Sequence, residues 1–137
     1  MRAVVDTNVI AYYLLGTPEF AAETRQFWQG VLEPLAPAIW EAELANVVWM
    51  SIRMGVLRGV DGTAKLHLAR RLGIHTVTTR SLWHGALLRA LQSGVAVYHT
   101  LFVELAERER LPFATFDQRL LKAWPAIAYR PADLIAR

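Results

Sequence analysis

Two acidic residues stand directly after short apolar segments, where a parallel sheet would deliver both to one edge. Asp6 follows the apolar residues 3–5, and Asp117 follows the strand-like segment 113–116. Ligands and reacting groups collect outside the carboxyl ends of the strands in open α/β sheets, so both carboxylates are candidates for chemistry. Each acid could instead cap the helix that follows it, because aspartate is a frequent N-cap residue. Taken singly, neither position separates these two interpretations.

A third acid, Glu43, falls in the first turn of an expected helix and has apolar neighbours on both sides. Asn46 follows three residues later, which puts the two polar side chains on the same face of that helix. Burying a carboxylate among apolar residues is costly unless it has a partner. Converging carboxylates repel one another unless a cation lies between them, and hard oxygen ligands select Mg²⁺ or Mn²⁺. A divalent-metal site made by Asp6, Glu43 and Asp117 therefore accounts for all three acids.

The elements that must position these acids alternate between strand-like and helical segments, which is typical of a parallel sheet covered by helices. The expected strands are 1–5, 35–39, 74–78, 112–116 and 127–129. The expected helices are 8–15, 18–30, 40–54, 61–73, 81–94, 98–110 and 118–124, with Asp61 and Ser81 as N-caps and Gly16, Gly55 and Gly94 as stops. Helical spacing favours the core over base stacking for Trp28, Trp40, Trp49 and Trp83.

Composition restricts the class of protein. The 137 residues, 54% of them hydrophobic, are enough for one domain with its own core, and we expect a single domain over 1–137. No run reaches the roughly eighteen apolar residues of a membrane span, and the apolar run before Asp6 is too short for a signal peptide, so we expect a cytoplasmic protein. The absence of cysteine excludes thiolate nucleophiles and cysteine-based zinc sites. A net charge of +3 suits a polyanionic partner without requiring one.

Four segments together resemble the ordered signatures of PIN-domain ribonucleases, specifically the VapC-type toxins of toxin–antitoxin pairs. They are Asp6-Thr7-Asn8, Glu43-Leu44-Ala45-Asn46, residues 98–107 and residues 111–120, and the resemblance runs from residue 1 to about 134. It implies a three-layer α/β/α fold with a central parallel sheet and cleavage of RNA phosphodiesters that depends on Mg²⁺ or Mn²⁺. It also implies an inhibitory VapB-like antitoxin and a homodimeric toxin.

The resemblance also implies roles for individual residues. Asp6, Glu43 and Asp117 would be the catalytic metal ligands. The polar residues beside them would orient these ligands or contact the substrate phosphate; they are Thr7, Asn8, Asn46 and Thr115. The basic residues expected to contact RNA are Arg53, Arg58, Lys65, Arg70, Arg71 and Arg80, although charges on a helix are often only solvated.

One position departs from the family pattern. Such proteins usually carry an acid directly after the tyrosine of the third signature, and here His99 follows Tyr98. Glu104 cannot replace that acid, because five residues turn a helix by about 140°. We therefore include His99 among the metal ligands and expect a preference for Mn²⁺, since imidazole suits transition metals better than Mg²⁺. The alternative is that His99 is a polar helix-start residue without a metal role.

Three functions are compatible with these residues to different degrees. An active metal-dependent endoribonuclease toxin is favoured. The alternative is a PIN-fold protein that binds RNA or an antitoxin with weakened or lost catalysis, for which His99 is the support. A phosphatase of the haloacid-dehalogenase type also begins with a strand-end aspartate, but its chemistry requires a second acid two residues later. This chain has Asn8 there, which disfavours the third function.

Overall fold

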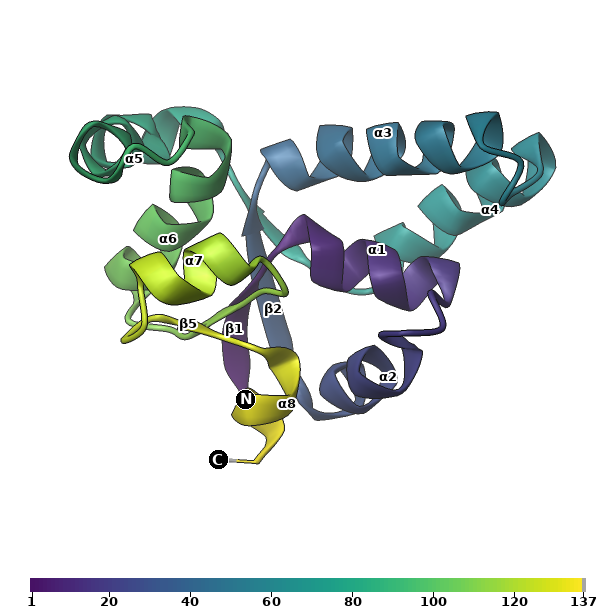
Figure 1. Ribbon diagram of the computed structural model, residues 1–137, viewed down its shortest axis with the longest axis horizontal. Helices are drawn as coiled ribbons and strands as arrows, with labels where there is room; N and C mark the ends of the chain where they lie inside the picture. Colours follow the sequence, from purple (N-terminus) through teal and green to yellow (C-terminus); the bar gives the residue numbers. More distant parts are fainter. Residues whose placement is uncertain (137) are drawn as a thin grey trace.

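A five-stranded sheet runs through the centre of the computed structural model, which describes residues 1–136. The strand order is β3-β2-β1-β4-β5, and all four pairings are parallel. The strands are β1 (Arg2–Val5), β2 (Glu33–Pro37), β3 (His75–Val77), β4 (Phe113–Ala114) and β5 (Ala128–Tyr129). Because every strand points the same way, all five carboxyl ends lie at one edge of the sheet, the upper edge in Figure 1.

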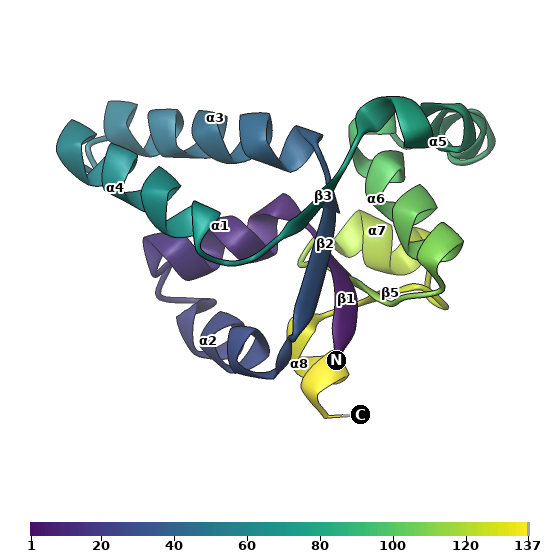
Figure 2. The ribbon, with the colours of Figure 1, turned by 180° about the vertical axis from the view of Figure 1, so that it is seen from behind.

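Helices cover both faces of this sheet and make the fold three-layered. On one side lie α1 (Thr7–Leu15), α2 (Ala21–Gly30), α3 (Ile39–Arg53) and α4 (Gly59–Arg70). On the other lie α5 (Thr79–Ser93), α6 (Val97–Glu109) and α7 (Gln118–Ala123), as Figures 1 and 2 show from opposite directions. A short C-terminal helix, α8 (Pro131–Ile135), packs on α2. The predicted α/β/α fold with a central parallel sheet is confirmed.

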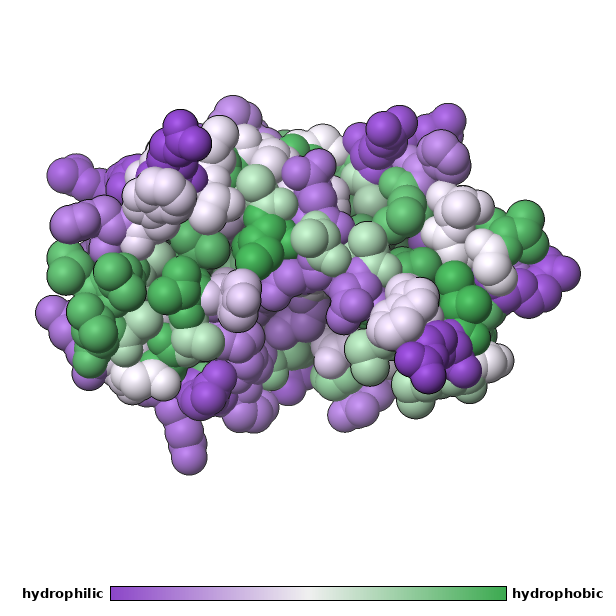
Figure 3. Space-filling view, turned by 90° about the horizontal axis from the view of Figure 1, so that it is seen from above, coloured by the Kyte–Doolittle hydropathy of each residue, from purple (hydrophilic) through white to green (hydrophobic). Residues whose placement is uncertain are grey.

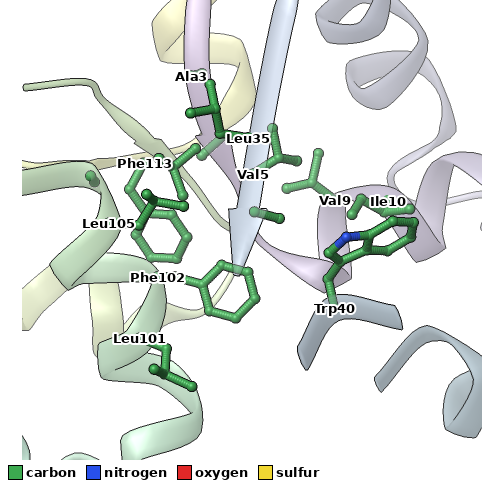
Figure 4. Packing of buried hydrophobic residues seen from close by; sticks show 14 of the residues in the cluster. Ala3, Val5, Val9, Ile10, Leu35, Trp40, Leu101, Phe102, Leu105 and Phe113 are labelled. Atoms are coloured by element: carbon green, nitrogen blue, oxygen red, sulfur yellow. The ribbon is translucent and has the colours of Figure 1, made fainter. Parts of the chain in front are cut away.

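Strand β1 is buried on both faces, which explains its uninterrupted apolar sequence. Val4 and Val5 are fully buried. On one side α6 contributes Phe102, whose ring stacks on that of Phe113 with 5.7 Å between centroids. On the other side α1 contributes Ile10, and Figure 4 shows these side chains meeting around β1. The core therefore fixes the strand whose end carries Asp6.

Several predicted boundaries are confirmed and others are wrong. Gly16 and Gly94 end their helices in the left-handed conformation, with φ of 62° and 73°. Asp61 and Ser81 are not N-caps, because each lies inside its helix and has a local partner: Asp61 accepts from Arg58, and the Ser81 hydroxyl donates to the Thr78 carbonyl. Helix α2 begins at Ala21 rather than at 18, and α8 was not expected from the sequence.

The tryptophans divide into two groups. Trp40 is buried and donates from Nε1 to the Thr76 hydroxyl at 3.0 Å, and Trp28 packs against the core, as predicted. The core prediction is wrong for Trp49 and Trp83, which are 52% and 54% exposed. Helical spacing shows which residues lie on the same face of a helix. It does not show which of two apolar faces packs on the sheet.

Within residues 1–136, no single helix is long and apolar enough to cross a membrane. Helices α5 and α6 reach the required length and apolar content only when they are taken together across the 115° bend between them.

Candidate active site

Asp6 lies where β1 ends and α1 begins, and its carboxylate is buried, with 6% of the residue exposed. It occupies the N-cap position of α1, but its side chain does not cap the helix. The carboxylate oxygen Oδ2 instead accepts hydrogen bonds from the Thr115 hydroxyl at 2.7 Å and from the Asn8 amide at 3.4 Å. The capping interpretation is therefore wrong for Asp6, whose carboxylate is directed across the sheet toward β4.

Asp117 reaches the same place from β4, which pairs directly with β1. The Asp6 amide donates to the Ala114 carbonyl at 2.9 Å, and the Asp117 amide donates to the Thr115 hydroxyl oxygen at 3.0 Å. Asp117 also caps α7, because its Oδ1 accepts from the amides of Arg119 and Leu120. The capping interpretation holds here, yet the carboxylate remains close enough to Asp6 to affect its pKa.

Glu43 joins from α3, the helix that follows β2 at the same edge of the sheet. The Thr7 hydroxyl donates to Oε1 of Glu43 at 2.7 Å, which ties the first turn of α1 to the first turns of α3. The Asn8 carbonyl oxygen Oδ1 accepts from the Phe116 amide at 3.3 Å, which ties α1 to the segment after β4. Each of the two polar residues after Asp6 thus bonds to a segment far away in the sequence.

Among residues 1–136, no basic side chain forms an ion pair that would offset the negative charge of the three acids. Burial raises the pKa of Asp6 to about 7; the Thr115 hydrogen bond opposes this rise, and the charges of Glu43 and Asp117 add to it. No lysine, arginine or histidine within residues 1–136 forms an ion pair with any of these acids. The poorly exposed acids elsewhere differ in this respect: Glu23 pairs with Arg130 and Glu104 with Arg89.

A hydrophilic hollow marks this edge on the molecular surface. Figure 3 looks down on the edge and shows the hollow between two raised apolar areas. The exposed apolar residues of α3 are Trp49 and Met50, with Met54 directly after the helix, and those of α5 are Trp83, Leu87, Leu88 and Leu91. The edge of the sheet that carries the acids is therefore open to a ligand.

The comparison with protein families decides what kind of domain this is. The pattern of the PIN domain matches residues 3–124, which is most of the chain and includes every predicted site residue. The chain belongs to the PIN-domain family.

Individual PIN-domain relatives agree with this assignment. The chain is 30% identical over 132 residues to Ribonuclease VapC3 of Pyrobaculum aerophilum, an alignment that covers 93% of this chain and 98% of the relative. Its fold is similar to the crystal structure of PAE2754 from the same organism, with a TM-score of 0.75 at 19% identity, over 100% of this chain and 88% of the other. It is also similar to VapBC2 of Rickettsia felis bound to a promoter DNA fragment, with a TM-score of 0.65 at 14% identity and coverage of 95% and 98%.

Among the described residues, two predicted site residues of this PIN domain form no hydrogen bond with the three acids. His99 is half-buried in the first turn of α6, and its ring has no hydrogen bond or ion pair with another described residue. Asn46 is exposed, and its amide donates to the sulfur of Met50 at 3.8 Å rather than to Glu43. In the part of the chain that the structure describes, no three histidine or acidic side chains are close enough to hold a metal ion. The donors suit a hard divalent cation in kind, and binding would require them to converge.

The contacts of Phe116 with Arg130 and of Arg130 with Glu23 could not be predicted from the sequence. The guanidinium of Arg130 lies over the ring of Phe116. Arg130 is in turn hydrogen-bonded to Glu23. Arg130 lies outside the residues that the PIN-domain pattern matches. No spacing or motif connects Glu23, Phe116 and Arg130, so only the fold could bring them together.

Proposed function

We propose that this PIN-domain protein is a cytoplasmic, divalent-metal-dependent endoribonuclease, the toxin of a type II toxin–antitoxin pair. Its relationship to Ribonuclease VapC3 along nearly the whole chain supports the ribonuclease activity. The observation that carries the proposal is the group of three acids at the carboxyl edge of the sheet, which have no basic partner in the part of the chain that the structure describes. This is the arrangement of charge that a divalent cation would offset.

Asp6, Glu43, Asp117 and His99 are the proposed ligands of Mg²⁺ or Mn²⁺. When bound, such an ion polarises the phosphate and brings the pKa of a water into nucleophilic range. The buried Asp6 is the central ligand, and Thr115 and Asn8 hold its carboxylate by hydrogen bonds. Because binding needs Asp6 ionised, a proton and the metal compete for it near neutral pH.

RNA is the proposed substrate, and Arg53 and Arg80 are proposed phosphate contacts. Arg53, at the end of α3, stacks on Trp49, and Arg80, in the first turn of α5, stacks on Trp83, with guanidinium carbons 5.0 and 5.8 Å from the ring centroids. Both arginines are exposed, so their charges remain available to a polyanion. The acids of the hollow would repel RNA without the cation, so metal and substrate binding should be coupled.

A VapB-like antitoxin and a second copy of the chain are the proposed protein partners. An apolar pocket of about 330 Å³ opens between α1, α2 and α4. It is a candidate binding site for an antitoxin segment with apolar side chains and with acidic side chains that could pair with Arg25 and Arg71. Its lining residues are Tyr13, Leu14, Gly16, Ala21, Arg25, Leu68, Arg71 and Leu72. The exposed apolar faces of α3 and α5 are the candidate homodimer contact, since contiguous exposed apolar patches mark interaction sites.

The alternative function is binding of RNA or of an antitoxin with weakened or lost catalysis, and the residue that supports it is His99. A PIN-fold protein that only bound RNA or the antitoxin would not need the acid that His99 replaces. The ring of His99 contacts none of the three acids through a hydrogen bond, so the described conformation does not oblige it to be a ligand. Measured turnover distinguishes the two functions.

The test is cleavage of purified RNA after removal of metals with a chelator. Cleavage should return with Mn²⁺ or Mg²⁺ and should be lost in Asp6→Asn. The matched control is Asp61→Asn, because Asp61 is a surface acid paired with Arg58 and distant from the hollow. Binding of RNA without any cleavage, in a folded wild-type protein supplied with both metals, would favour the alternative function.

A further inference from the structure

Phe116 separates two residues of the candidate site and faces away from both. Thr115 directs its hydroxyl to Asp6, and Asp117 directs its carboxylate to the start of α7. Side chains that follow one another along an extended backbone point to opposite sides. The Phe116 ring accordingly points toward the helix layer that contains α1 and α2. There it packs on Phe20 at 4.7 Å and on Tyr12 at 5.4 Å between centroids, and only 8% of the residue is exposed.

Arg130 also packs on the Phe116 ring. Its guanidinium carbon lies 5.0 Å from the ring centroid. Glu23 fixes the orientation of the guanidinium, because Nη2 donates to Oε1 at 2.7 Å and Nε donates to Oε2 at 3.4 Å. The amide of Ala132 donates to the same carboxylate at 2.9 Å. Glu23 therefore binds both the guanidinium of Arg130, which lies over the ring, and the first turn of α8.

The backbone beside Arg130 is hydrogen-bonded to the segment Thr115-Phe116-Asp117. The Thr115 amide donates to the carbonyl of Tyr129, the residue before Arg130, at 3.0 Å. Phe116 is thus held on its ring by Arg130, and Thr115 is held on its backbone by the end of β5. A shift of the ring would displace two amides at once: that of Phe116, which bonds to Asn8, and that of Asp117, which bonds to Thr115.

We propose that Arg130 is a positioning residue for the acid cluster, acting through the ring of Phe116. Glu23 orients Arg130, the guanidinium holds the ring, and the ring sets where Thr115 and Asp117 lie relative to Asp6. Arg130 touches none of the reacting groups. The effect on metal binding rests on the proposed function, whereas the effect on the local backbone does not.

The first measurement is amide hydrogen exchange in the metal-free protein. Arg130→Met keeps an unbranched apolar stem but removes the guanidinium. We expect the amides of Phe116 and Asp117 to exchange about tenfold faster, while the amide of Leu105 in α6 is unchanged, because local opening is separate from global unfolding. The matched control is Arg2→Met, which breaks the Arg2–Glu33 ion pair at the opposite edge of the sheet. It should leave the Phe116 and Asp117 amides as they are.

The second measurement is calorimetric titration with Mn²⁺. Arg130→Met should weaken binding about tenfold, which is the size seen when groups that orient metal ligands are removed. Arg130→Lys keeps a positive charge beside Glu23 but cannot stack a planar group on the ring. Its Mn²⁺ affinity should lie between those of the wild-type protein and Arg130→Met. If Arg130→Met does not fold, Arg130→Lys carries both measurements.

A double-mutant cycle separates positioning from mere docking of α8. In a Phe116→Leu background, Arg130→Met should add nothing to exchange or to Mn²⁺ affinity, because the ring through which it acts is gone. Equal effects of Arg130→Met in both backgrounds would overturn the proposal, as would unchanged exchange at Phe116 and Asp117 in folded Arg130→Met. If the wild-type protein binds no Mn²⁺, the proposed function fails, and hydrogen exchange still decides the role of Arg130.

Discussion

The hydroxyl of Thr115 donates to Oδ2 of Asp6 at 2.7 Å, although the two residues are 109 positions apart in the sequence. A hydroxyl has one proton to donate, so the proton of Thr115 is committed to Asp6 and its lone pairs remain as acceptors. One of them receives the amide of Asp117 at 3.0 Å. A single side chain thereby sets the position of two of the three acids relative to each other.

Thr115→Val should weaken metal binding and cleavage without preventing folding. Valine has nearly the shape of threonine but neither donates to Asp6 nor accepts from Asp117. We expect Mn²⁺ affinity and cleavage to fall by about 10- to 100-fold, the usual effect of losing a group that orients a metal ligand. Calorimetry and RNA cleavage measure the two effects. Thr115→Ser, which keeps the hydroxyl, is the control, and equal losses in both variants would contradict the expected role of the hydrogen bond.

Asp6→Asn should stabilise the metal-free protein, and by more at pH 8 than at pH 5. The pKa of Asp6 is about 7 in the folded protein and 3.8 ordinarily, so the folded state holds the extra proton between these values. Stability of the wild-type protein therefore falls as pH rises from 3.8 to 7. At about 1.36 kcal/mol per pH unit, the cost at pH 8 is at most about 4 kcal/mol.

The asparagine variant has no proton to lose at this position and should escape that fall. Urea unfolding of both proteins in chelator, at pH 5 and pH 8, measures the difference in the free energy of unfolding. A wild-type protein that gains stability relative to Asp6→Asn as pH rises would show that the Asp6 carboxylate is stabilised in its ionised form, contrary to the expectation from its burial.

His99→Asp should move metal preference toward Mg²⁺. An aspartate at the start of α6 supplies a hard oxygen donor in place of imidazole, which Mg²⁺ binds poorly. We expect the ratio of Mg²⁺ affinity to Mn²⁺ affinity to rise about tenfold or more, with Mg²⁺-dependent cleavage rising in parallel. Calorimetric titration with both ions decides the matter. If affinities, preference and cleavage all stay the same, His99 has no part in the site.

Leu87→Glu should dissociate the proposed homodimer, because it buries a charge in the apolar contact formed by α5. Sedimentation of the wild-type protein should give a dimer at micromolar concentration, and the variant a monomer. The control is Leu32→Glu, since Leu32 is a more exposed leucine, at 79%, and stands before β2 at the far end of the sheet. A wild-type protein that sediments as a monomer would remove the homodimer from the proposed function.

The layers of the fold could be predicted because the local signals agree with the final structure. A short apolar run that ends in an acid predicts a buried strand, and both Asp6 and Asp117 stand directly before a helix as expected. Glycines in the left-handed conformation end α1 and α5 where the sequence indicates. The order of the strands and the pairing of β1 with β4 depend on contacts between distant residues, which such signals do not contain.

The errors have physical causes that differ from one residue to the next. Trp49 is exposed because α3 has two apolar faces and only the one with Trp40, Leu44 and Val48 meets the core. Asp61 is not an N-cap because α4 begins earlier, at Gly59, which places Asp61 inside the first turn. Arg130 was missed because its partners Glu23 and Phe116 are not near it in the sequence. The errors at Trp49 and Arg130 arise from tertiary contacts, which local sequence preferences do not contain.

The pairing of β1 with β4 also sets when the acids can first come together during synthesis. Asp6 is among the first residues to be made, but its partner Thr115 and the third acid follow only after β4, more than a hundred residues later. Contacts of such high sequence separation form late in folding. A nascent or truncated chain that lacks residues from 113 onward contains Asp6 and Glu43 without Thr115 and Asp117. The fold thus makes synthesis of β4 and of Asp117 a condition for assembling the site.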